Sequence, residues 1–391
     1  NRNDEASIFA GYMVGMEVAL RGVGASVFWE YGKYSTILLL STGMIVENIK
    51  YLKLNTLSVI YFVSLLPSIA LMPDVKFDWQ RQMVSANLSG PLCLFISFIY
   101  FRRRIFSDVN ISNVFKTLML PIISLLGLIF TRAPKMQDLS FSSEANFEMS
   151  AGFGPNQVST LLGVSLVIIS LSRMFNVKIF PKQIYDYIFL IVSIGVALLT
   201  FARGGVLAPI IAITFSYYLG DVKYKIKKSR LFYIFLIFLS LYYFSTTITK
   251  GLIDARYASL FNYFDSQQTV LTGRAKIIVI DFQIFRDNFL MGVGPGAGHQ
   301  ERMNYGYGSA VAAHSEFSRM LAEHGLFGLI SLFSLLFLSF QEYQKRTGYN
   351  KIILGCMSIF GILTMFHSAF RLALPGYIYG LSYVVLKLRE K

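Results

Sequence analysis

His314 combines a residue type and a position that suit acid–base chemistry. It follows a glycine-rich loop at residues 292–298 and a polar segment that contains tyrosines. It precedes an apolar run, from Phe317 to about Phe340, that can span a bilayer. If Ser315 or a neighbour caps a helix there, the partial positive charge of the helix N-terminus disfavours imidazolium. A neutral imidazole can accept a proton, so His314 is a candidate general base, although a histidine at a membrane boundary often only forms hydrogen bonds.

Two glycines follow His314 on the same helix. Helical spacing places five residues on roughly one face: His314, Ser318, Leu321, Gly325 and Gly328. Because glycines let backbones approach closely, we expect another helix to pack against this face and to support the histidine.

Two arginines are candidates for holding phosphate, because the planar, permanently charged arginine fork pairs with phosphate oxygens through two donors. Arg203 lies in a short break between two apolar spans, where it is suited to a lipid pyrophosphate or only to snorkelling toward water. Arg274 and Lys276 begin an amphipathic pattern that continues through residues 277–285. That pattern predicts a helix lying along the membrane surface, with Arg274 as a second phosphate contact or an ordinary surface charge.

Three charged residues repeat within the apolar run that follows His314. Glu316, Arg319 and Glu323 are three and four positions apart, so they fall on one side of a helix. We expect them to form a buried charge ladder that supports the site.

Other familiar chemistries lack their motifs. The sequence has no Walker loop, no paired-histidine zinc motif and no serine nucleophile elbow, and the glycine run lacks the strand that a dinucleotide fingerprint needs. Cys93 and Cys356 lie far apart in apolar segments, without ligands at metal spacing. We therefore expect no metal and no cofactor.

The composition is that of a membrane protein. The chain has 391 residues, of which 54% are hydrophobic, with 35 Phe and 23 Tyr. Its formal charge of +14 comes mainly from short loops between apolar spans, as expected of cytoplasmic loops, so nucleic-acid binding is not indicated.

Twelve segments are candidate membrane spans, which predicts an all-α, polytopic transmembrane helix bundle in a single domain, residues 1–391. The first three cover about residues 8–27, 34–46 and 54–72, the fourth ends at 102–104, and the fifth covers 114–130. The sixth opens at 154–157, and the next three cover 184–201, 206–219 and 231–247. The tenth is the His314 helix, the eleventh reaches 367, and the twelfth ends before 387.

Basic loops orient these spans. Residues 102–104, 223–230 and 345–351 are rich in Lys and Arg and are predicted to be cytoplasmic, although Arg21 and Lys33 count against this parity. Both termini are then cytoplasmic, and residues 249–313 form a long periplasmic loop region between spans nine and ten. His314, Arg203 and Arg274 all lie at that outer face.

Three segments resemble the O-antigen ligase and polymerase family. Residues 313–329 (AHSEFSRMLAEHGLFGL) are similar to its histidine signature, and residues 199–205 (LTFARGG) to its arginine–glycine segment. Support comes from Gly273–Arg274 and from residues 288–294 (NFLMGVG). The family pattern usually has Asn or Thr where this chain has Ser315, and commonly Ser where it has Ala202.

The resemblance implies a membrane-embedded C-type glycosyltransferase of the bacterial inner membrane, which transfers a glycan from undecaprenyl pyrophosphate to an acceptor hydroxyl at the periplasmic face. His314 would act as general base or orient the acceptor hydroxyl, while Arg203 and Arg274 would hold the pyrophosphate. Lys276, Glu316, Arg319 and Glu323 are possible supporting residues. Two arginines can stabilise the departing pyrophosphate without a metal, and direct displacement inverts the anomeric configuration.

The acceptor distinguishes two activities. A polymerase, which we favour, uses another lipid-linked repeat unit, whereas a ligase uses the lipid A core. Membrane lipids and a chain-length regulator are further candidate partners.

A flippase or polysaccharide transporter is the alternative of another class. It would also have about twelve spans, and it would depend on buried charges such as Glu17, Arg21, Arg319 and Glu323 rather than on His314. A purely structural membrane partner is the third interpretation.

Overall fold

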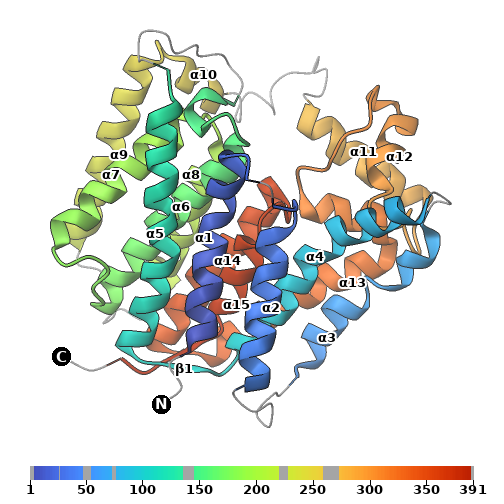
Figure 1. The fold of residues 1–391 in the computed structure, drawn as a ribbon, viewed down its shortest axis with the longest axis horizontal. Helices are drawn as coiled ribbons and strands as arrows, with labels where there is room; N and C mark the ends of the chain where they lie inside the picture. Colours follow the sequence, from blue (N-terminus) through green and yellow to red (C-terminus); the bar gives the residue numbers. More distant parts are fainter. Residues whose placement is uncertain are drawn as a thin grey trace.

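The structure, a computed structural model, describes residues 4–25, 27–46, 54–72, 76–134, 145–219, 228–258 and 273–388 (Figure 1). These residues confirm the all-α fold. Their α-helices are α1 (Glu5–Gly22), α2 (Tyr31–Val46), α3 (Thr56–Val63), α4 (Phe77–Phe101), α5 (Asp108–Arg132), α6 (Pro155–Phe175), α7 (Gln183–Leu199), α8 (Arg203–Leu219), α9 (Lys228–Ile248), α10 (Leu252–Ala258), α11 (Gly273–Asp287), α12 (Gly298–Arg302), α13 (Glu316–Lys345), α14 (Gly348–Ser368) and α15 (Leu374–Leu381).

Five helices of the described chain are long and apolar enough to cross a membrane: α4, α5, α6, α13 and α14. Shorter apolar helices accompany them, so the chain is a multi-pass membrane protein. A helix occurs at each of the twelve predicted positions, but α3 and α15 have only eight residues each. α3 ends four residues before Pro67, which begins a separate 3₁₀ turn, Pro67–Leu71, because proline has no N–H to donate to a continuing α-helix. The number of crossings stays a prediction.

Helix α6 lies at the centre of the bundle and is buried along almost its whole length. It packs against α8 through two glycines, since a Cβ on Gly163 would overlap the carbonyl oxygen of Gly205. This close backbone contact positions the start of α8, where Arg203 lies, against the start of α6.

Both ends of the chain lie at one end of the molecule, together with the arginine triplet (Figure 1). Strand β1 (Ile105–Phe106) pairs in parallel with β2 (Val385–Leu386). Arg104 forms an ion pair with Asp4 at 3.0 Å, and Arg346 donates a 2.7 Å hydrogen bond to the carbonyl just before β2. The predicted orientation requires this grouping, and the side of the membrane that this end faces stays a prediction.

The two cations that counted against the orientation are neutralised locally. Arg21 pairs with Glu17 at 2.6 Å, and Lys33 pairs with Glu30 and donates to the carbonyl of Phe370 at 3.0 Å. Because each cation is paired with a carboxylate, the two contribute little to the orientation of the chain in the membrane.

Helices α10, α11 and α12 lie at the opposite end of the molecule from the termini (Figure 1). They belong to the predicted loop region 249–313, of which residues 259–272 fall outside the described chain. The apolar face of α11, with Ile277, Ile280 and Ile284, is buried, and Ile280 and Ile284 cluster with Ala322 of α13. This apolar face therefore packs against α13, and the expectation that α11 lies along the membrane surface stays a prediction.

Helix α13 breaks at Gly325, which has φ 59° and ψ −135°. The loop after α11 fits into this break and donates backbone hydrogen bonds of 3.1 and 3.0 Å to the carbonyls of Ala322 and Glu323. A Cβ on Gly325 would collide with that loop, and one on Gly328 with α13's own preceding turn. The expectation that both glycines admit a neighbouring helix was wrong, since they serve the break and the loop.

Candidate functional site

A cavity of about 640 Å³ opens between the starts of α2 and α13, the middle of α4 and the loop after α14. It is unusually rich in ionisable groups for a membrane bundle. The charged residues that line it are Glu30, Lys33, Arg302, Glu316, Arg319, Glu323 and Arg371. Ala312 and Ala313, which lead directly to His314, line it as well.

His314 lies half-buried in the segment that precedes α13. Nη2 of Arg371 donates to the carbonyl of Ala313 at 3.0 Å and lies 3.4 Å from Nδ1 of His314. Ser315 occupies the N-cap position, as expected, but its side chain makes no capping hydrogen bond. Arg371, 57 residues further along the chain, therefore orients the imidazole more directly than its own helix does.

The pKa of His314 is lowered to about 4, first by burial and then by the positive charges of Arg371, Arg274 and Arg302. The ring is therefore neutral at pH 7, as predicted. The physical cause differs from the predicted one, because burial and three arginines lower this pKa.

The contact with Arg371 also selects a tautomer of His314. A guanidinium can only donate, so Nδ1 must accept, and the neutral ring carries its proton on Nε2. In this arrangement Nε2 can donate a hydrogen bond to a substrate oxygen. Nδ1 can take a proton once Arg371 has turned away.

Of the predicted phosphate-binding residues, Arg274 comes near His314. It is exposed at the start of α11, and its charge acts on the imidazole. Lys276 has partners within the protein. Its Nζ donates to the carbonyl of Gly306 at 2.8 Å and lies 5.5 Å from the centre of the Tyr307 ring. Lys276 thus links α11 to the turn at 303–307.

Arg203 begins α8 and is half-buried. The next residue, Gly204, packs directly against the imidazole of His367, whose Nε2 lies 3.0 Å from Oγ1 of Thr160. Arg203 thus lies at the same end of the bundle as the cavity. Neither Arg203 nor Arg274 is among the described residues that line it.

The ion pairs predicted for Glu316, Arg319 and Glu323 form, and all three side chains are buried. Arg319 donates to Glu316 at 3.0 Å, to Glu323 at 2.7 Å and to Oδ1 of Asn87 at 2.6 Å. Glu323 also accepts from the backbone N–H of Gly296 at 3.0 Å. The ladder therefore ties α13 to α4 and to the glycine loop.

A second buried ion pair was not predicted from the sequence. Arg302 is 1% exposed and donates to Asp281 at 2.7 Å and to the carbonyl of Val311 at 3.0 Å. Ser318 donates to the other oxygen of Asp281 at 2.6 Å. Burial raises the pKa of Asp281, and the positive charge of Arg302 opposes that rise. These bonds hold together α11, α12, α13 and the segment before His314, and no local sequence pattern marks them.

Within the described ranges, no group of three or more His, Cys, Asp or Glu side chains could hold a metal ion. Metal independence stays a prediction.

Comparison with known proteins gives a family match for part of the chain. No curated protein matches the chain. A family model described as O-Antigen ligase matches residues 188–333, a segment that contains Arg203, Arg274 and His314. The match confirms the resemblance seen in the sequence. Residues 188–333 are therefore a domain of the O-antigen ligase family.

Proposed function

We propose that the protein transfers a glycan from undecaprenyl pyrophosphate to a hydroxyl of an acceptor glycan at the periplasmic face, with a lipid-linked repeat unit as acceptor. It is then a polymerase of the O-antigen type. The observation that carries the proposal is the pairing of a neutral His314 with Arg371 beside a charged cavity, with Arg274 close enough to act on the imidazole.

The reaction needs a base and a stabilised leaving group. The acceptor oxygen forms a bond to the anomeric carbon while the bond from that carbon to the pyrophosphate oxygen breaks. The bonding pair leaves with undecaprenyl pyrophosphate, the anomeric configuration inverts, and the hydroxyl proton goes to His314. Arg203, Arg274 and Arg371 supply positive charge for the departing pyrophosphate, so the chemistry requires no metal.

Donor binding also prepares the base in this mechanism. A bound pyrophosphate offsets the positive charges of Arg371 and Arg274, which are among the causes of the low pKa of His314. It also draws Arg371 away and frees Nδ1 to accept a proton. His314 is therefore a weak base in the empty site and a stronger one when the donor is bound.

Purified protein in liposomes with synthetic undecaprenyl-pyrophosphate glycan tests the proposal, with product size measured by gel mobility. We expect a product ladder from the donor alone, lost in His314→Ala. Ser309→Ala is the matched control, because Ser309 is exposed on the same segment and lies outside the cavity lining, so this variant should keep the ladder.

Two other outcomes would change the assignment. Product that forms only when lipid A core is added would make the protein a ligase. The transporter alternative would replace the enzyme if no acceptor gives product while the donor crosses the bilayer equally well in wild type and His314→Ala.

A further inference from the structure

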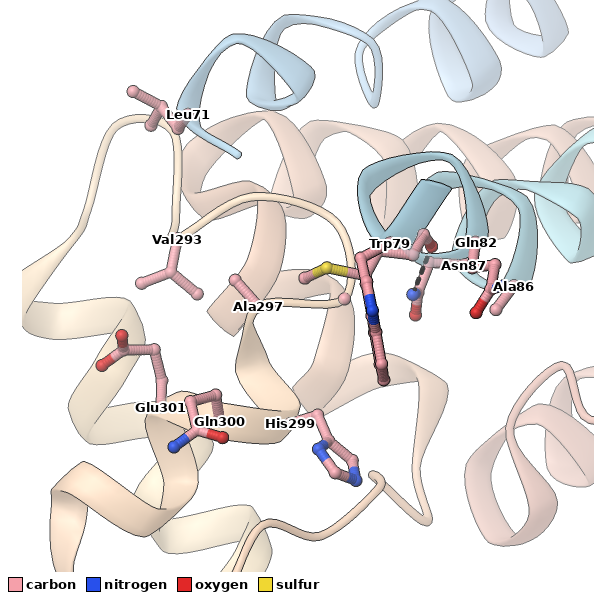
Figure 2. A pocket seen from close by; sticks show the side chains of 12 residues that line it. Leu71, Trp79, Gln82, Ala86, Asn87, Val293, Ala297, His299, Gln300 and Glu301 are labelled. Atoms are coloured by element: carbon pink, nitrogen blue, oxygen red, sulfur yellow. Dashed lines mark hydrogen bonds between the residues drawn. The ribbon is translucent and has the colours of Figure 1, made fainter. Parts of the chain in front are cut away.

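A second cavity, of about 700 Å³, adjoins the first. It lies between Leu71, the first turns of α4, the glycine loop and α12. Figure 2 shows Trp79 pointing from α4 toward His299, with Gln300 and Glu301 next to His299 on α12. Ala86, Asn87, Gly296 and His299 line both cavities, so the two cavities are direct neighbours.

The two cavities differ in charge. Four cationic residues and three acidic ones line the first: Lys33, Arg302, Arg319, Arg371, Glu30, Glu316 and Glu323. None of the described residues lining the second is a lysine or an arginine. The second cavity has one carboxylate, Glu301, and therefore does not suit a pyrophosphate. The first cavity has cationic side chains that can meet the donor's charged end, whereas the second has none and suits an uncharged group.

The second cavity has the chemistry of a sugar site. Trp79 is 64% exposed and offers a broad aromatic face to the C–H groups of a pyranose ring. Gln82, Gln300 and Glu301 provide amide and carboxylate groups that bond hydroxyls. Apolar walls with a few convergent polar groups are the usual design of a small-molecule site.

We propose that the second cavity binds the acceptor glycan, with Trp79 stacking on one of its sugar rings. This inference rests on the proposed glycosyl transfer. In an inverting displacement the acceptor approaches from the side opposite the pyrophosphate. Arg371 and Ala313, which adjoin His314, line only the first cavity. An acceptor held beside Trp79 therefore approaches the donor from the side where the shared residues lie.

The first test uses the glycan released from the donor by acid hydrolysis, without lipid or pyrophosphate, as a soluble acceptor at fixed donor concentration. In Trp79→Ala the concentration for half-maximal transfer should rise about tenfold, and the donor KM should stay within about twofold of wild type. Trp79→Phe keeps an aromatic face and should fall between the two. Phe77→Ala is the matched control, because Phe77 is 76% exposed on the same helix and lies outside the cavity lining.

Three results would overturn the subsite. These are unchanged acceptor use in Trp79→Ala, a raised donor KM in its place, or an effect of Trp79→Ala equal to that of Phe77→Ala. The last result would make Trp79 an anchor at the membrane interface.

A binding measurement separates this inference from the proposed function. Trp29 and Trp79 are the two tryptophans, so in Trp29→Phe the fluorescence comes from Trp79 alone. The free glycan, added without donor, should shift that emission saturably. A shift without any transfer in wild type would support the subsite and contradict the proposed enzyme activity. His314-dependent transfer without a shift would support the enzyme activity and contradict the subsite.

Discussion

Arg371 acts on His314 in three ways through one guanidinium. It donates to the carbonyl of Ala313, it lies 3.4 Å from Nδ1, and its charge lowers the imidazole pKa. A single side chain thus fixes the position and tautomer of the proposed base and, after burial, contributes to keeping it neutral. Each of these effects depends on whether Arg371 is pairing with His314 or with a bound anion.

The pH dependence of transfer should reflect this coupling. The pKa of His314 is about 4 in the empty site, so the ring loses its ability to accept a proton only as the pH falls through about 4. We expect kcat/KM, which reports the free enzyme, to stay flat from pH 8 to about 5 and to fall below that. The inflection of kcat, which reports the donor complex, should lie at higher pH. Coinciding inflections would contradict the proposed role of the donor.

Substitution of Arg371 should test its part in this coupling. In Arg371→Ala a positive charge and a donor are lost, so kcat should fall about 10²-fold and the kcat/KM inflection should move to higher pH. Arg371→Lys keeps the charge, so its inflection should stay closer to that of wild type. Arg286→Ala, which removes an exposed arginine outside the site, is the control for both. An unmoved inflection in Arg371→Ala would exclude the coupling.

At the scale of elements, the buried ion pairs connect helices that are distant in the sequence. Arg319 bonds to Asn87, 232 residues earlier, and Arg302 bonds to Asp281 across 21 residues. These bonds fix α4, α11, α12 and α13 around the segment that carries His314. The position of that segment therefore depends on the ion pairs as well as on apolar packing.

Glu323→Gln should destabilise the protein. It leaves Arg319 with one carboxylate and weakens the bond to Gly296, and breaking a buried pair in this way costs about 3 kcal/mol. Glu342→Gln is the matched control on the same helix, where the pair with Arg346 is longer, at 3.8 Å, and less buried. Thermal unfolding in detergent should show a clearly lower midpoint for Glu323→Gln. Equal midpoints would show that the ladder is not needed for stability.

The break in α13 should tolerate only glycine. Gly325→Ala places a Cβ 2.5 Å from the carbonyl oxygen of Phe289 at a φ of 59°, so we expect a loss of at least about 2 kcal/mol and reduced transfer. Gly127→Ala in α5 meets nothing within 4 Å and should be neutral or slightly stabilising. Unfolding midpoints of both variants check this, and a wild-type midpoint for Gly325→Ala would contradict the role of the break.

At the scale of the whole molecule, helices α11 and α12 lie at the opposite end from the chain termini (Figure 1). The predicted orientation places the site outside the cytoplasm. Cysteine labelling in intact cells tests this, because Cys93 and Cys356 are buried and should react little. A membrane-impermeant maleimide should label Ser309→Cys directly and Lys387→Cys only after the inner membrane is permeabilised. The reverse pattern would place the site in the cytoplasm.

The helices could be predicted from the sequence because apolar runs and their breaks are local signals. The start of α6 at Pro155 and the run of α13 after His314 were found in this way. Only local sequence was needed for the ladder of Glu316, Arg319 and Glu323, since side chains three and four residues apart meet on any helix. His314 and Arg274 were proposed as site residues from residue type, position and resemblance, and their roles stay predictions.

What the sequence determined by itself is therefore the α-helical membrane bundle, its basic loops and the contacts within single helices. The tertiary structure decided which distant residues meet: Arg371 with His314, Arg302 with Asp281, and Trp79 with the wall of a second cavity. It also decided that α13 breaks at Gly325 to admit the loop after α11. The physical reason is that helical periodicity acts over a few residues, whereas these contacts depend on how separate helices pack, which no local pattern specifies.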